Sequence, residues 1–160
     1  MRNPDPVLAI PLSFVAAVLL SLCPIPEPLD VCRPDWLLIM LVFWTLHQPE
    51  WVGIWTAFVA GLLLDVVYGT AFGIFPFSLC LVAWIARWQS RRLRLLPIPF
   101  MALGFGLLSL VAMSVRYVLQ DFQGHLPGSP LYWMPVFGNI VAWPLAAILL
   151  QHWQRPLNRD

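Results

Sequence analysis

The chain has 160 residues, of which 60% are hydrophobic and only 11% are charged. Soluble domains carry roughly 25% charged residues, so this composition excludes an ordinary water-facing surface and indicates one domain in a bilayer. The formal net charge of +1 excludes the strongly basic surface of a nucleic-acid-binding protein. We therefore expect residues 1–160 to form a single all-α integral membrane domain.

Apolar stretches of membrane-spanning length follow one another along the whole chain. A spanning helix needs about 20 mostly apolar residues, with a range of about 17–25. The sequence predicts spans at about 7–23, 33–48, 50–68, 72–88, 98–119 and 132–153.

The stretch Trp36–Leu64 is almost continuously apolar apart from His47–Glu50, so it fits either one long tilted helix or a hairpin of two short ones. Pro49 and its neighbours favour a turn. The arginines also favour the hairpin, because with six spans and a cytoplasmic N-terminus the basic loop Arg87–Arg94 faces the cytoplasm, whereas five spans would place it outside. We predict a six-transmembrane-helix bundle with both termini cytoplasmic, whose basic loop contacts anionic lipid headgroups.

Four charged residues fall at one membrane level in this topology. Asp65 lies in the outer half of the third span, Arg116 reaches a similar depth on the fifth, and Arg33 and Asp35 begin the second span on the same side. A charge in hydrocarbon costs a few kcal/mol or more unless it is paired or lines a cavity. We therefore predict that Asp65 pairs with Arg116 or Arg33. Two interpretations stay open, a structural ion pair that sets helix register and a ligand or partner site.

The glycines near Asp65 predict a close helix contact. Gly61, Asp65 and Gly69 are four residues apart, so they share one helix face on which another helix can approach closely. A turn is expected after Tyr68, where Gly73 serves the backbone geometry. In the last span, Pro144 predicts a kink.

No pattern of catalytic residues is present. The chain has no H-E-x-x-H, no cluster of cysteines and histidines and no G-x-S-x-G, and His47, His125 and His152 lie far apart in the topology. We expect no catalytic residue, no metal site and no cofactor. Cys23 and Cys32 would lie near the outer face, where two free thiols are favoured over a disulfide.

Several motifs together resemble one protein family. They are Arg33-Pro34-Asp35-Trp36, Phe43-Trp44, the series Gly61, Asp65, Gly69 and Gly73 at intervals of four, and Asn139-x-x-x-Trp143-Pro144. This pattern is similar to that of MreD, the rod shape-determining inner-membrane proteins of bacteria. Phe43 stands where members often have a tyrosine, which removes a hydroxyl group here.

The resemblance implies a function that composition does not reach. It implies a non-catalytic, multi-pass inner-membrane component of the cell-elongation machinery that binds an MreC-like single-span protein. It implies indirect contact with MreB and with RodA and its transpeptidase, and thereby a part in controlling rod shape and lateral peptidoglycan synthesis. Asn139, Trp143 and Pro144, with Gly61, Gly69 and Gly73, become candidates for the helix-packing or partner face. A homodimer stays open.

The same resemblance supplies an alternative. The family looks similar in fold to the substrate-binding S-components of energy-coupling-factor transporters, which implies a small-ligand-binding subunit of a transporter. A solute pocket needs several convergent polar groups. Within the spans the sequence offers only Asp65, Arg116, Asn139 and scattered hydroxyl side chains, which is few for such a site.

Overall fold

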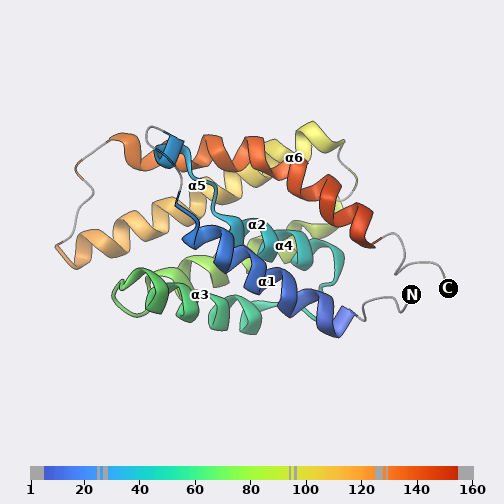
Figure 1. Cartoon of the computed structure of the whole chain (residues 1–160), viewed down its shortest axis with the longest axis horizontal. Helices are drawn as coiled ribbons and strands as arrows, with labels where there is room; N and C mark the ends of the chain where they lie inside the picture. The colour runs from blue at the N-terminus through green and yellow to red at the C-terminus, as the bar shows by residue number, and fades with distance from the viewer. Residues whose placement is uncertain are drawn as a thin grey trace.

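A computed structural model of the chain describes residues 6–24, 26, 29–93, 95, 97–124, 128 and 130–154. The secondary structure of this part is helical throughout (Figure 1): α1 (Pro6–Leu22), α2 (Trp36–His47), α3 (Ile54–Tyr68), α4 (Ile74–Leu93), α5 (Ile98–Phe122) and α6 (Met134–Gln154), with the short 3-10 helices η1 (Leu29–Cys32) and η2 (Pro130–Trp133). The prediction of an all-α fold is confirmed for the described residues. The single domain over residues 1–160 and the membrane crossing of each helix stay predictions.

The six helices alternate in direction along the bundle. In Figure 1, α1, α3 and α5 run one way and α2, α4 and α6 run back, so that α1 begins and α6 ends at the same end. We call that end the inner end and the other the outer end, after the predicted topology. In the described part, the stretches Pro99–Phe122 and Leu131–Leu150 are long and apolar enough to cross a membrane, and three shorter apolar helices accompany them.

The centre of the bundle is α2, which packs against α1, α4 and α6. Every residue from Leu37 to Leu46 except Met40 is buried. A helix that is apolar all round belongs inside a larger assembly, and twelve residues give a length of only about 18 Å. The helix begins at Trp36 because Asp35 caps it, with Oδ1 accepting a hydrogen bond from the N–H of Leu38 (3.2 Å). The apolar sequence of α2 thus serves the core of the bundle.

The link between α2 and α3 is a tight turn. The N–H groups of Trp51 and Val52 both donate to the carbonyl oxygen of Gln48 (3.1 and 3.0 Å). The hydroxyl of Thr56 then accepts from the N–H of Gly53 (2.9 Å) at the start of α3. The predicted hairpin is therefore confirmed, and the alternative of one long helix is excluded.

Candidate functional site

Asp65 lies in the last turn of α3 and is 1% exposed. Its carboxylate accepts three hydrogen bonds: Oδ1 from the hydroxyl of Thr70 (3.0 Å) and the N–H of Phe75 (3.1 Å), and Oδ2 from the N–H of Gly73 (2.6 Å). Gly73 and Phe75 stand at the start of α4, where backbone N–H groups have no partner within the helix and attract negative charge. Asp65 therefore caps α4 from the end of α3.

Arg116 reaches inward from α5 and is 8% exposed. Its Nη1 lies 2.7 Å from Oδ2 of Asp35, and its Nε donates to the hydroxyl oxygen of Ser78 on α4 (3.0 Å). Its guanidinium carbon also lies 4.3 Å from the centre of the Phe75 ring, which places the cation over an aromatic face. Oδ2 of Asp35 has no directed hydrogen bond among the described residues, so its contact with Arg116 is ionic.

Asn139 connects α6 to two other helices. Its Oδ1 accepts the N–H of Asp35 (2.7 Å), and its Nδ2 donates to the hydroxyl oxygen of Ser109 on α5 (2.6 Å). Asn139 is 1% exposed and Ser109 is fully buried. An apolar interior requires each buried polar group to find a partner, and here the partners come from different helices. The amide thus holds the start of α2 against α5 and α6.

These contacts form one connected set, which we call the polar network: Asp35, Asp65, Ser78, Ser109, Arg116 and Asn139. Phe75 completes the connection, because its N–H donates to Asp65 while its ring lies beneath Arg116. The network joins five of the six helices near the outer end of the bundle.

The prediction that Asp65 pairs with Arg116 or Arg33 is wrong. Arg116 pairs with Asp35 instead, and Arg33 donates from Nη2 to backbone carbonyl oxygens at the end of α1, including that of Cys23 (2.8 Å). Asp65 needs no arginine, because the turn that follows it donates three hydrogen bonds to its carboxylate. Hydrogen bonds to a carboxylate are stronger than those between neutral groups.

The glycines divide into two roles. A Cβ at Gly61 would overlap the backbone of Pro76, so the helix that approaches this position is α4 of the same chain. Gly69 and Gly73 have φ angles of 63° and 108°, and a Cβ at either would meet no atom within 4 Å. They serve the turn between α3 and α4, which corrects the prediction that Gly69 and Gly73 belong to the helix-packing or partner face.

The α6 side chains of Asn139 and Trp143, predicted to form a helix-packing or partner face, are buried inside the bundle. Trp143 is 1% exposed and stacks on Phe105 of α5, with ring centres 4.3 Å apart and planes at 17°. A Cβ at Gly138 would overlap the backbone of η1, so η1 lies directly against α6. Pro144 lies inside the helix, one residue beyond Trp143. Asn139 and Trp143 are therefore internal contacts of this chain.

Sequence reasoning missed Ser78 and Phe75. Ser78 is fully buried, and its hydroxyl donates to the carbonyl oxygen of Phe75 in the preceding turn (2.9 Å). A serine in an apolar helix can satisfy itself in this way, so its second contact with Arg116 has no signal in the sequence.

Within the described residues, no three His, Cys, Asp or Glu side chains lie close enough together to hold a metal ion. Cys23 and Cys32 are free thiols. The polar network holds helices together through an ion pair and hydrogen bonds.

Comparison with known proteins places this architecture. Residues 2–153 match the family model for the rod shape-determining protein MreD. The chain is similar to the rod shape-determining protein MreD of Haemophilus influenzae, with 27% identity over 145 residues that cover 89% of this chain and 88% of the relative. No solved structure matches, and the likeness to transporter S-components stays a prediction. The resemblance read from the motifs is confirmed: the chain belongs to the MreD family of rod shape-determining proteins, which are bacterial membrane proteins.

Proposed function

We propose that this protein is a non-catalytic, multi-pass component of the cell inner membrane that binds an MreC-like single-span protein. Through that partner it acts with MreB and with the RodA–transpeptidase synthase, and so helps to control rod shape and lateral peptidoglycan synthesis. The observation that carries the proposal is the family match over residues 2–153, nearly the whole chain.

The polar network supports a scaffold in preference to a solute-binding subunit. A solute site needs polar groups that converge on a hollow. None of the six network side chains lines the groove between α1 and α3, the pocket at the α2–α3 turn or the small void beside Trp143. Five of these side chains contact one another, and Asp65 bonds to the turn between α3 and α4, an arrangement that suits the fixing of helix positions.

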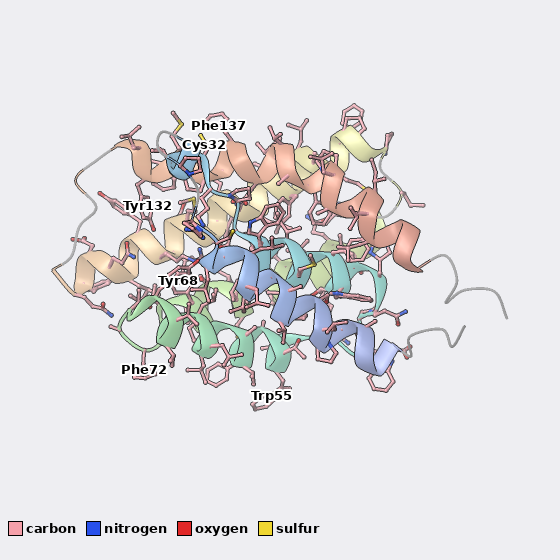
Figure 2. The ribbon with its side chains drawn as sticks, in the orientation of Figure 1. Cys32, Trp55, Tyr68, Phe72, Tyr132 and Phe137 are labelled. Carbon is pink, nitrogen blue, oxygen red and sulfur yellow. The ribbon has the colours of Figure 1, made fainter. Side chains whose placement is uncertain are left out.

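The surface of the bundle supports a membrane location with six crossings. Trp55 and Phe137 project from opposite edges of the molecule (Figure 2) and are 81% and 64% exposed. Apolar side chains exposed on both edges suit contact with lipid, since water would penalise them. The alternating helix directions bring the first and last helix ends to the inner end, as a cytoplasmic placement of both termini requires (Figure 1).

Co-purification tests this function directly. The chain, with a terminal tag, is extracted gently from its native membrane, and the proteins that accompany it are identified by mass spectrometry. We expect the MreC-like protein to be recovered, with or without wall synthases. Recovery of ATP-hydrolysing subunits and a transporter coupling protein in its place would favour the small-ligand alternative and overturn the proposal.

A shape assay tests the function in the cell. In a rod-shaped host that lacks its own MreD, expression of the chain should restore rods, and cells without it should stay round. A chain that reaches normal abundance in the membrane without restoring rods would contradict the proposed role.

A further inference from the structure

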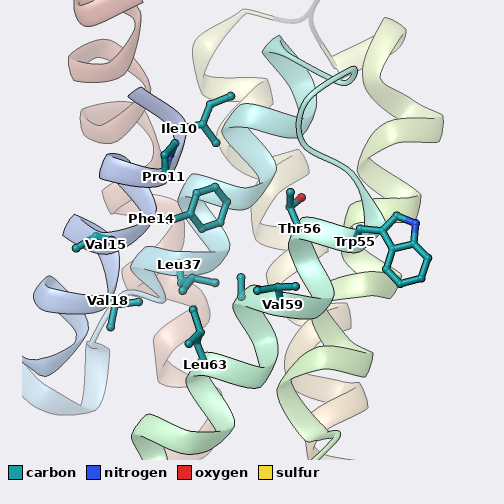
Figure 3. Close-up of a pocket in the computed structure, with 11 residues that line it drawn as sticks. Ile10, Pro11, Phe14, Val15, Val18, Leu37, Trp55, Thr56, Val59 and Leu63 are labelled. Atoms are coloured by element: carbon teal, nitrogen blue, oxygen red, sulfur yellow. The ribbon is translucent and has the colours of Figure 1, made fainter. Parts of the chain in front are cut away.

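An apolar groove runs between α1 and α3, with Leu37 of α2 at its floor (Figure 3). Its volume is about 510 Å³. Phe14 and Val18 line it from α1, and Val59 and Leu63 line it from α3. Neither wall helix is the main packing partner of the other, because α1 packs on α2 and α3 packs on α4. The groove is therefore open to whatever lies beside the bundle in the membrane.

A second hollow of about 590 Å³ lies at the inner end, between the α2–α3 turn and the later part of α4. Four of the nine tryptophans of the chain gather there with one carboxylate and one guanidinium: Trp51, Trp55, Trp84, Trp88, Glu50 and Arg87. We call it the tryptophan pocket. Interfacial tryptophans usually form a belt around a membrane protein, whereas these four line a single hollow.

The two hollows adjoin each other along α3. Trp55 and Thr56 line both of them, at the first turn of that helix. From Thr56 to Leu63 the groove follows about 10 Å of helix axis toward the outer end. An object lying in the groove would therefore have its inner end beside the tryptophan pocket.

The aromatic rings of the tryptophan pocket favour a cation. Tryptophan faces attract cations more strongly than other aromatic rings do, and the exposed carboxylate of Glu50 adds a negative charge. The guanidinium of Arg87 also belongs to the lining, where its Nη1 donates to the carbonyl oxygen of Pro49 (2.9 Å), so the pocket holds one charge of each sign. Transmembrane helices carry their excess of lysine and arginine on the cytoplasmic side, which is the side predicted for this pocket.

We propose that the α1–α3 groove seats one apolar transmembrane helix of a partner protein, and that the tryptophan pocket binds the basic residue at the cytoplasmic end of that helix. This inference rests on the proposed function, and it locates the contact with the single-span partner. Apolar side chains of the partner fill the groove, where the small side chains of Thr56 and Ala60 permit close approach. The cationic end fixes the depth and direction of the helix.

Site-specific photo-crosslinking in membranes tests the groove. Benzoylphenylalanine is placed at Val59 or Leu63 in the full chain, co-expressed with its tagged single-span partner. Matched controls carry it at Leu107 or Val141, which are equally apolar and are 67% and 68% exposed on other helices. We expect crosslinks to the partner helix from the groove positions and at least fivefold fewer from the controls. Groove positions that label only lipid, while the unsubstituted chain retains the partner, would overturn the groove proposal and leave the proposed function standing. Loss of the partner from the unsubstituted chain would overturn both.

Charge variants test the tryptophan pocket separately. Glu50→Gln should lower the amount of partner retained about 2- to 5-fold, as an exposed cation–π and ion-pair contact implies. Asp121→Asn, which removes an exposed carboxylate at the outer end, should leave retention unchanged. If Arg87→Gln lowers retention and Glu50→Gln does not, the pocket binds an anionic group such as a lipid phosphate, and the cationic end of the proposal is overturned.

Discussion

Nη1 of Arg116 lies 2.7 Å from Oδ2 of Asp35, which joins α5 to the residue that caps α2. The two side chains are 10% and 16% exposed, so little water screens the contact. Asp35 also donates its N–H to Asn139, so the start of the central helix is held by a charge on one side and an amide on the other. The helix with the most buried residues is thereby positioned by polar contacts at its end.

Removal of one partner of this ion pair should destabilise the bundle strongly. Arg116→Gln leaves the buried carboxylate of Asp35 without its cation, and we expect a loss of about 3–5 kcal/mol in the free energy of unfolding. Titration of the purified protein with a denaturing detergent measures this loss. Arg92→Gln, at an exposed arginine of α4, is the control.

A second variant separates the ion pair from general damage. Asp35→Asn combined with Arg116→Gln should lose less than the sum of the two single losses, because neither charge is then left unpaired. Strict additivity would contradict a direct interaction between the two side chains.

Asp65→Asn should destabilise the α3–α4 turn while the backbone path is kept. An asparagine keeps one acceptor oxygen, but its terminal NH2 group cannot accept the hydrogen bonds that the second carboxylate oxygen of Asp65 accepts. The negative charge is also lost. We expect a loss of about 1.5–3 kcal/mol, seen as a lower unfolding midpoint and lower abundance in membranes. A variant of native stability that loses its partner would instead show that Asp65 acts in recognition.

Gly61→Ala should force α3 and α4 apart, because the new methyl group would overlap the backbone of Pro76. Overpacking of this kind costs typically about 1–3 kcal/mol. Gly128→Ala, at an exposed position where a Cβ meets nothing within 4 Å, should be nearly neutral. Equal stability of the two variants, measured by thermal unfolding in detergent, would rule out the close approach of the helices.

Asn139→Leu keeps the approximate size of the side chain but removes its two hydrogen bonds. The N–H of Asp35 would then lack its 2.7 Å acceptor, and we expect a loss of about 1–3 kcal/mol. Ser114→Ala is a suitable control, since that hydroxyl bonds only within α5, to the carbonyl oxygen of Leu110. A loss for Asn139→Leu no larger than that of the control would mean that the amide bridge contributes nothing to stability.

The helices could be predicted because their signals are local. Apolar runs set where each helix lies, and Pro49 marks the turn between α2 and α3, where a proline disfavours helix in the residue before it. The glycines after Tyr68 also marked the α3–α4 turn. The partners of the buried polar side chains could not be predicted in the same way, because they are distant in sequence. Asp35 and Asn139, for example, are 104 positions apart.

By itself, the sequence determined the class of protein, the family and the helices, because composition, apolar length and motif spacing are properties of the chain as a string of residues. It also predicted that four charges lie at one membrane level. Only the tertiary structure decided that Arg116 pairs with Asp35, that Gly61 packs against α4, and that an apolar groove meets a tryptophan pocket along α3. These relationships depend on how each helix is rotated about its axis and on which helix lies beside it. The sequence predicted only the depth of each residue along its helix, which determines neither.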